Sequence, residues 1–160
     1  MLGEQTLKDD HEEILQLVSF KIGREEFGVD ILRVQEIIKM LQITSVPNTS
    51  DFIEGVVNLR GKVIPVVDLR TKLGIVKKVH DKDTRIVVVE LDDKTVGFIV
   101  DEVNEVLRIP KSITEAPPEM VSSIHSDFIT AVGKLEDRLI ILLDLEKTLS
   151  TNDIRELESV

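Results

Sequence analysis

The fold is decided by one stretch of the chain, Phe52-Ile-Glu-Gly-Val-Val-Asn-Leu-Arg-Gly-Lys-Val-Ile-Pro-Val-Val-Asp-Leu69. It contains two short aliphatic runs, 56–59 and 63–69, on either side of Arg60-Gly61. Valine and isoleucine favour β-strands, and glycine readily adopts the positive φ that a tight hairpin turn often needs. We therefore predict a β-hairpin in which Gly61 has a positive φ. Pro65 has no backbone N–H, so the second strand is expected at a sheet edge or with an outward-facing position there.

The hairpin stretch occurs twice, and so does an earlier block. The second hairpin, 76 residues after the first, is Phe128-Ile-Thr-Ala-Val-Gly-Lys-Leu-Glu-Asp-Arg-Leu-Ile-Ile-Leu-Leu-Asp-Leu145. In the earlier block, at an offset of 69 residues, Gly28, Val34, Glu36 and Ile37 match Gly97, Val103, Glu105 and Val106. A period near 70 is too long for a solenoid, so two blocks in the same order predict two similar β-rich units. A unit of this size buries a limited fraction of its surface, and the two should therefore pack against each other.

The composition of the 160 residues argues against several classes of protein. With 30 acidic and 20 basic residues the net charge is −10, which disfavours a nucleic-acid partner, because phosphate binding needs clustered Lys and Arg. The longest apolar runs are about five residues, whereas a membrane span needs roughly 20. There is no cysteine and no hydrophobic signal segment at the N-terminus. We expect a soluble cytoplasmic protein without direct membrane insertion.

The ends of the chain differ in composition from the middle. Residues 1–13 are charged and predict a flexible N-terminal tail, while residues 14–150 form the folded domain. Residues 151–160 predict a short C-terminal helix, in which Asp153 and Glu156 resemble a capping box.

Two segments inside the domain need separate interpretation. Residues 31–39 fit either a helical stripe or a strand, and we expect a short helical turn near 30–33 that leads into a strand. Residues 77–84 are charged and predict a linker between the two copies.

No arrangement of residues typical of catalysis is found. The three histidines, His11, His80 and His125, occur in polar segments without metal-ligand spacing. Adjacent acidic pairs are typical of solvated turns, and no set of nucleophile, base and oxyanion donors can be assembled. We therefore predict that the protein is not an enzyme and has no cofactor or metal.

Two charged residues stand in apolar surroundings. Glu36 lies within Val-Gln-Glu-Ile-Ile, and Arg60 lies at the apex of the first hairpin. A partly buried carboxylate needs a partner, and a planar guanidinium is the best one. We predict a charge pair between Glu36 and Arg60, although Arg60 would also fit a simple turn residue.

At these residues the sequence resembles the CheW family of chemotaxis coupling proteins. The resemblance spans about residues 14–150 and rests on four motifs: Phe27-Gly-Val-Asp-Ile-Leu-Arg-Val-Gln-Glu-Ile37, Phe52-Ile-Glu-Gly-Val-Val-Asn-Leu-Arg-Gly61, Ile64-Pro-Val-Val-Asp-Leu69 and Val96-Gly-Phe-Ile-Val-Asp-Glu-Val103. It implies a mainly β fold of two intertwined five-stranded SH3-like β-barrels with a few short helices. The sub-barrels would cover about 14–82 and 83–150, with possible strand exchange.

The resemblance also implies a function and its residues. The function is that of a non-catalytic adaptor in two-component signalling, recruited to membrane receptor arrays. It would couple the cytoplasmic tips of methyl-accepting chemoreceptors to the regulatory domain of the histidine kinase CheA. The receptor-binding groove maps onto Val34, Ile37, Val103 and Val106, and the charge pair onto Glu36 and Arg60. Gly55 and Asn58 are the expected kinase-binding positions.

Two other classes of protein stay open at this point. A ligand-binding β-barrel would have a sizeable internal cavity, whereas two small filled barrels would not. An oligonucleotide-binding barrel is disfavoured by the negative charge and by the lack of aromatic residues on which bases could stack.

Overall fold

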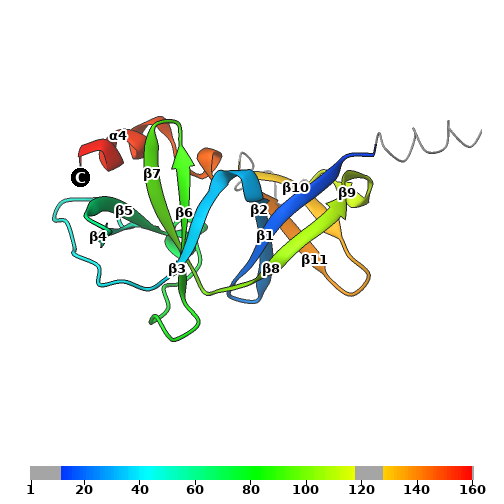
Figure 1. The fold of residues 1–160 in the computed structure, drawn as a ribbon, viewed down its shortest axis with the longest axis horizontal. Coiled ribbons are helices and arrows are strands. Elements are labelled where there is room, and N and C mark those ends of the chain that lie inside the picture. The colour runs from blue at the N-terminus through cyan, green and yellow to red at the C-terminus, as the bar shows by residue number, and fades with distance from the viewer. Residues whose placement is uncertain (1–11, 118–127, 160) are drawn as a thin grey trace, which may run out of the picture.

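The structure is a computed structural model that describes residues 12–117 and 128–159. It consists of two mixed β-sheets that lie side by side along the long axis of the molecule (Figure 1). Sheet A contains β1 (Ile14–Ile22), β2 (Glu25–Asp30), β8 (Glu102–Pro110), β9 (Thr114–Glu115), β10 (Ile129–Lys134) and β11 (Leu139–Leu143), in the order β8-β1-β2-β11-β10-β9. Sheet B contains β3 (Val34–Lys39), β4 (Ile53–Leu59), β5 (Lys62–Asp68), β6 (Arg85–Leu91) and β7 (Lys94–Val100), in the order β3-β6-β7-β5-β4. The mainly β fold class is confirmed.

Short helices connect and cap the strands. They are η1 (Ile31–Arg33), α2 (Leu69–Lys72), η2 (Lys111–Ile113), η3 (Glu146–Thr148) and α4 (Thr151–Ser159). The expected helical turn followed by a strand in residues 31–39 is present as η1 and β3. Within residues 12–117 and 128–159, no helix is long and apolar enough to cross a membrane. Most of the predicted N-terminal tail, together with His11 and His125, lies outside the described residues.

The two sheets do not follow the two halves of the sequence. The β1–β2 hairpin of the first half lies in sheet A with strands of the second half, and the β6–β7 hairpin of the second half lies in sheet B with strands of the first. Two parallel strand pairs join the two halves of the sequence. Leu142 of β11 lies beside Gly28 of β2, and Val66 of β5 lies beside Gly97 of β7. These pairs are equivalent under the repeat. A division near residue 82 therefore separates two copies in sequence but not the two sheets in space.

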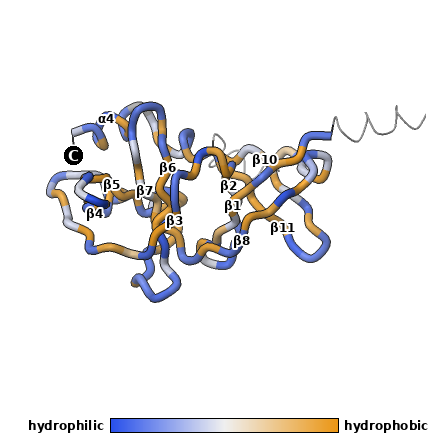
Figure 2. Tube along the Cα trace, in the orientation of Figure 1, coloured by the Kyte–Doolittle hydropathy of each residue, from blue (hydrophilic) through white to orange (hydrophobic). Residues whose placement is uncertain are grey.

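The main hydrophobic core lies between the sheets and takes side chains from both. Val18 and Phe20 of β1 meet Val87 and Phe98 of sheet B in one buried cluster. Each sheet also has a smaller cluster of its own. Figure 2 shows the apolar residues concentrated along the strands and the polar residues at the turns. Burial of apolar surface stabilises a fold by roughly 25 cal/mol per Å² removed from water. Burial in the shared core therefore contributes to holding the two sheets together.

The turn between β4 and β5 has a left-handed backbone conformation at both central residues. Gly61 has φ 84°, as expected from the sequence, and Arg60 has φ 53°. Two positive φ values match the type of two-residue turn that fits the twist of paired strands. The Oδ1 atom of Asn58 accepts a hydrogen bond of 2.8 Å from the Gly61 N–H and so fixes the turn.

The position of β5 differs from the expectation for a strand that contains a proline. β5 lies inside sheet B, between β7 and β4, and not at an edge, and Pro65 is buried and does not face outward. Pro65 is paired with Val56 of β4, and the parallel pairing with β7 starts only at the next residue, Val66. The missing N–H of Pro65 is tolerated because the proline lies just before that parallel ladder begins.

The cap of the C-terminal helix also differs from the prediction. The helix begins at Thr151, so the reciprocal cap is formed by Ser150 and Asp153 instead of Asp153 and Glu156. The Ser150 N–H donates to Asp153 at 2.8 Å, and the Asp153 N–H donates to the Ser150 hydroxyl at 3.1 Å. Glu156 instead accepts hydrogen bonds from the backbone N–H and the hydroxyl of Ser50, which fasten α4 to the loop before β4.

We predict that Gly55→Ala destabilises the protein far more than Gly61→Ala. Gly55 has φ 147°, and a Cβ atom there would lie 2.1 Å from the backbone oxygen of Thr44. Thr44 is bonded to Val56 through two backbone hydrogen bonds of 2.9 Å, so it cannot easily move away. A Cβ at Gly61 meets nothing within 4 Å. We expect Gly55→Ala to lower the free energy of unfolding by about 3 kcal/mol or more and Gly61→Ala by about 1 kcal/mol.

Chemical denaturation of the two variants measures both losses. Equal small losses would contradict the contact between Gly55 and Thr44.

Candidate functional site

The four apolar residues expected at the receptor groove lie on two equivalent edge strands. Val34 and Ile37 are on β3, the edge of sheet B, and Val103 and Val106 are on β8, an edge of sheet A. Ile37 is paired with Val87 of β6, and Val106 is paired with Val18 of β1. Since Val18 and Val87 belong to the shared core, both edge strands flank that core.

The four residues divide into two half-buried and two exposed side chains. Val34 and Val103 pack against the shared core and therefore help to hold the sheets together. Ile37 is 39% exposed and Val106 is 54% exposed. An unpaired strand edge offers backbone groups to a partner, and the exposed aliphatic side chains of Ile37 and Val106 lie on two such edge strands.

Glu36 and Arg60 form the expected charge pair. Both guanidinium NH₂ groups of Arg60 donate to the Glu36 carboxylate, one of them at 3.1 Å, so the pair is bidentate and joins the edge strand β3 to the β4–β5 hairpin. The Glu36 side chain is 31% exposed and that of Arg60 is 69% exposed, so the pair lies at the surface and is not buried. The hydrogen bond from Arg60 lowers the pKa of Glu36 below its ordinary value.

A second charged group on sheet A corresponds to this pair under the repeat. Arg138, two residues beyond the position equivalent to Arg60, donates to Glu105, the counterpart of Glu36, at 3.1 Å. Arg138 also donates to Glu26 at 2.7 Å. Glu26 is only 8% exposed and accepts a further hydrogen bond from the buried hydroxyl of Ser19. The charge pair on sheet A is therefore anchored to a buried carboxylate, whereas the charge pair on sheet B is not.

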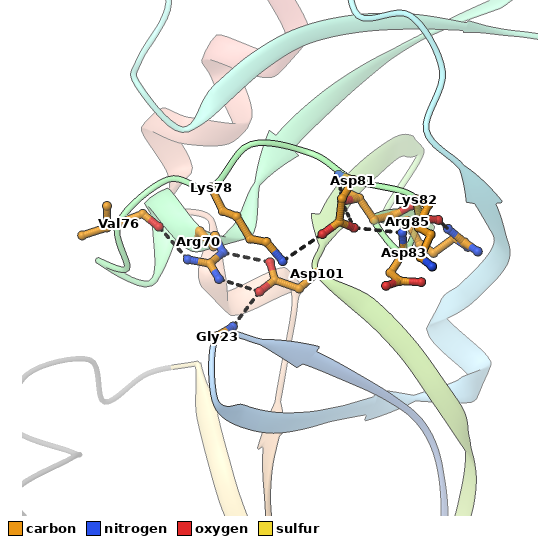
Figure 3. A network of polar contacts seen from close by, with 10 residues as sticks. Gly23, Arg70, Val76, Lys78, Asp81, Lys82, Asp83, Arg85 and Asp101 are labelled. Atoms are coloured by element: carbon orange, nitrogen blue, oxygen red, sulfur yellow. Dashed lines mark hydrogen bonds and ion pairs between the residues drawn. The ribbon is translucent and has the colours of Figure 1, made fainter.

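A bidentate ion pair ties the two sheets together at the crossover from β7 to β8. Arg70 of α2 donates to Asp101 through Nε at 2.8 Å and through an NH₂ group at 2.5 Å (Figure 3). Asp101 also accepts the backbone N–H of Gly23, in the β1–β2 turn of sheet A, at 2.7 Å. The two side chains are about 15% exposed. We call Arg70, Asp101 and Gly23 the crossover clamp.

The crossover clamp has a weaker counterpart at the other crossover, from β2 to β3. There Arg33 of η1 lies 3.6 Å from Glu146 of η3, the position equivalent to Arg70, and the two side chains are 53% and 36% exposed. The two crossovers are thus held by contacts of unequal strength. Sequence reasoning missed both contacts because their partners are far apart in the chain. The repeat offered one signal, since Glu146 occupies the position of Arg70.

The expected kinase-binding residues lie on the β4–β5 hairpin of sheet B. Asn58 is exposed, and its side chain supports the turn at Gly61. Gly55 is buried under Thr44, so the structure gives it a packing role that needs no partner. Among residues 12–117 and 128–159, no three His, Asp or Glu side chains are grouped to hold a metal ion.

Together these features define an interaction module, with exposed apolar side chains on two edge strands and charge pairs beside them. The model of the CheW-like domain matches residues 16–153, and the chain belongs to the CheW family. Proteins of this family are non-catalytic scaffolds in chemotaxis.

Named relatives are similar to this chain over most of its length. The chemotaxis protein CheW of Helicobacter pylori is 39% identical over 142 residues, which cover 89% of this chain and 86% of the relative. That of Klebsiella aerogenes is 37% identical over 145 residues, covering 91% of this chain and 87% of the relative. The crystal structure of the scaffolding protein TtCheW from Thermoanaerobacter tengcongensis is similar with a TM-score of 0.80 and 40% identity, covering 88% of this chain and 96% of that one.

The two charge pairs should differ in their effect on stability. Arg138→Ala leaves the buried carboxylate of Glu26 without its cationic partner, and an unpaired buried charge is strongly destabilising. Arg60→Ala leaves Glu36 at the surface, where water replaces the guanidinium. We expect a clear fall in the denaturation midpoint for Arg138→Ala and almost none for Arg60→Ala. Comparable midpoints for the two variants would show that Glu26 does not depend on Arg138.

The crossover clamp should make stability depend on pH. Burial by itself raises the pKa of Asp101, but hydrogen bonds from Arg70 and Gly23 outweigh it, so the pKa lies below its ordinary value. The stabilisation by ionised Asp101 is therefore complete above the unfolded-state pKa of about 3.9 and is lost as the pH falls through the lower, folded-state pKa. We expect Asp101→Asn to lower the free energy of unfolding by about 2–3 kcal/mol at neutral pH, and the difference to shrink below about pH 4.

Urea denaturation between about pH 2.5 and 7 measures this difference. Asp83→Asn is the matched control, since Asp83 is an exposed carboxylate in the neighbouring loop, and it should change stability little at any pH. A loss for Asp101→Asn that stays constant over the whole range would contradict the role of the carboxylate charge.

Proposed function

We propose that this protein is a cytoplasmic adaptor that couples chemoreceptor tips to the chemotaxis histidine kinase, CheA, in membrane receptor arrays. The observation that carries the proposal is the exposure of Ile37 and Val106 at equivalent places on two edge strands, in a chain of the CheW family. An adaptor needs separate surfaces for its two partners, and we assign them to the edge strands β3 and β8 and to the β4–β5 hairpin.

The receptor surface is proposed on the edge strands β3 and β8. Val34 and Val103 form its half-buried floor, and Ile37 and Val106 provide apolar side chains that an amphipathic receptor helix can cover. The pair of Glu36 and Arg60 lies beside Ile37 and would fix the orientation of that helix, because exposed charges contribute more to specificity than to affinity.

The kinase surface is proposed on the β4–β5 hairpin, with Asn58 at its exposed face and Gly55 shaping the backbone beneath it. The kinase regulatory domain resembles the CheW family, so this contact could be quasi-symmetric and could repeat head to tail into rings. Signals would then pass as small changes in these two contacts.

The packing of the interior does not favour a ligand-binding barrel. The cluster inside sheet B is filled by aliphatic side chains of β4, β5, β6 and β7, in the manner of a small barrel without a ligand cavity.

We predict that Ile37→Ala combined with Val106→Ala weakens binding of a receptor-tip fragment and leaves binding of the kinase regulatory domain nearly unchanged. Removing one well-placed apolar anchor typically costs about 1–2 kcal/mol, a loss of roughly five- to thirty-fold in affinity. Because both side chains are partly exposed, the melting temperature should stay close to that of the wild type. Isothermal titration calorimetry with each partner measures the two affinities.

The matched control is Val63→Ala combined with Leu139→Ala. These residues are also equivalent under the repeat and are 62% and 59% exposed, but they belong to β5 and β11 and not to the edge strands β3 and β8. The control should bind the receptor fragment like the wild type. Equal loss of receptor binding in both double variants would mean that β3 and β8 are not the receptor surface.

A further inference from the structure

The C-terminal helix α4 lies at the end of the molecule that sheet B forms (Figure 1). Under the 76-residue offset of the repeat, its residues 151–159 correspond to residues 75–83. The structure describes all of residues 75–83, and they form coil and a turn instead of a helix. The repeat therefore does not account for α4, and the contacts of the helix indicate which part of sheet B it supports.

The helix is held in place by the shared core and by α2. Leu157 is buried in that core, and Ile154 packs against it. Asp153 accepts a hydrogen bond of 2.5 Å from Lys72 of α2, and the two side chains are largely buried. The ammonium group of Lys72 also lies 4.5 Å from the ring centroid of Phe52. A helix of nine residues is marginal by itself, so these tertiary contacts are what keep it folded.

Glu156 of α4 is bonded to the loop that precedes β4. Its carboxylate accepts one hydrogen bond from the backbone N–H of Ser50 and another, of 2.6 Å, from the hydroxyl of the same residue. The carbonyl of Ser50 in turn accepts the N–H of Ile53, the first residue of β4, at 3.0 Å. Hydrogen bonds to a charged acceptor are stronger than neutral ones. Glu156 therefore fixes the point at which β4 begins.

The same loop, residues 40–52, covers part of the outer edge of β4. β4 is the edge strand of sheet B opposite to β3, and Thr44 of the loop is bonded to Val56 through two backbone hydrogen bonds of 2.9 Å. Gly55 packs against Thr44, and Asn58 lies two residues beyond Val56 on the same strand. The loop is thus held by β4 at one end and by Glu156 at the other. The strand that it covers carries both residues proposed for the kinase surface.

We propose that Glu156 is a positioning residue for the kinase surface. By fixing Ser50 it orders the loop of residues 40–52 along β4, so that Gly55 and Asn58 are presented in one conformation before the kinase binds. A surface that is ordered in advance binds more tightly, because less conformational entropy is lost on association. The inference rests on the proposed kinase surface and adds to it a part of the chain, the C-terminal helix, that lies outside the β4–β5 hairpin.

The test compares Glu156→Ala with Glu158→Ala in the full-length protein. Glu158 is an exposed glutamate of the same helix, so its variant is the matched control. Isothermal titration calorimetry with the kinase regulatory domain should show a loss of affinity of roughly three- to tenfold for Glu156→Ala and none for Glu158→Ala. Binding of the receptor-tip fragment should be unchanged in both variants. Glu156→Gln keeps an acceptor for the N–H of Ser50 and should restore most of the affinity for the kinase.

A second measurement does not need the kinase. The backbone N–H groups of Ile53 and Val56 donate to Ser50 and Thr44 of the loop. Their hydrogen exchange should be faster in Glu156→Ala than in Glu158→Ala, because the loop opens more often when Ser50 is released. Exchange of the β1 amides in sheet A should be the same in both variants, which separates a local opening of the loop from a general loss of stability.

Unchanged exchange at Ile53 and Val56 would overturn the inference, whatever the kinase affinity. An equal loss of kinase and receptor affinity would also overturn it, because α4 would then only stabilise the fold as a whole. If the wild type binds the kinase domain and Glu156→Ala binds it equally well, the positioning role is wrong and the proposed function stands. If the wild type does not bind the kinase domain, the proposed function fails and this inference fails with it.

Discussion

Two parallel strand pairs, β5 with β7 and β11 with β2, hold the two sequence copies together. Each pair joins a strand of one sequence copy to a strand of the other, so neither sheet can form from one copy alone. The shared core between the sheets follows from this exchange, because Val18 and Phe20 of the first copy meet Val87 and Phe98 of the second. Contacts between residues so far apart in sequence form slowly, but once formed they make the two sheets one cooperative unit.

The exchange also determines where the surface is available to partners. Each sheet receives its edge strand, β3 or β8, directly after a crossover, and these strands lie beside the shared core with one edge unpaired. Ile37 and Val106 are exposed there for the same topological reason. The crossovers need their own support, which Arg70 and Asp101 supply at one of them with nearly buried groups. Arg33 and Glu146 give weaker support at the other crossover, from β2 to β3.

The two copies share a backbone and differ in chemistry. Val88 contributes to the cluster of sheet B, whereas the equivalent Ser19 donates to Glu26 in a buried polar network. Sheet A therefore has a smaller apolar cluster of its own and depends on Arg138 to neutralise a buried carboxylate. A duplicated fold can in this way carry different surfaces at equivalent positions.

Features that depend on near neighbours in the chain could be predicted from the amino-acid sequence. The alternation of aliphatic residues, the Arg60-Gly61 turn and the repeat were enough to predict strands, hairpins and two similar units. The motifs around Glu36 and Arg60 were enough to predict their pairing and the family. The β5 position was predicted less well, because whether Pro65 is tolerated depends on which strand lies beside it and where that pairing starts.

How the two copies combine is visible only in the folded chain. The sequence allowed strand exchange but could not show that β1–β2 and β6–β7 change places, because both arrangements bury the same aliphatic residues. Arg70 meets Asp101, and Glu26 meets Arg138, only after that exchange. Short-range patterns fix which residues form strands, whereas burial and charge pairing over long sequence distances depend on the completed topology.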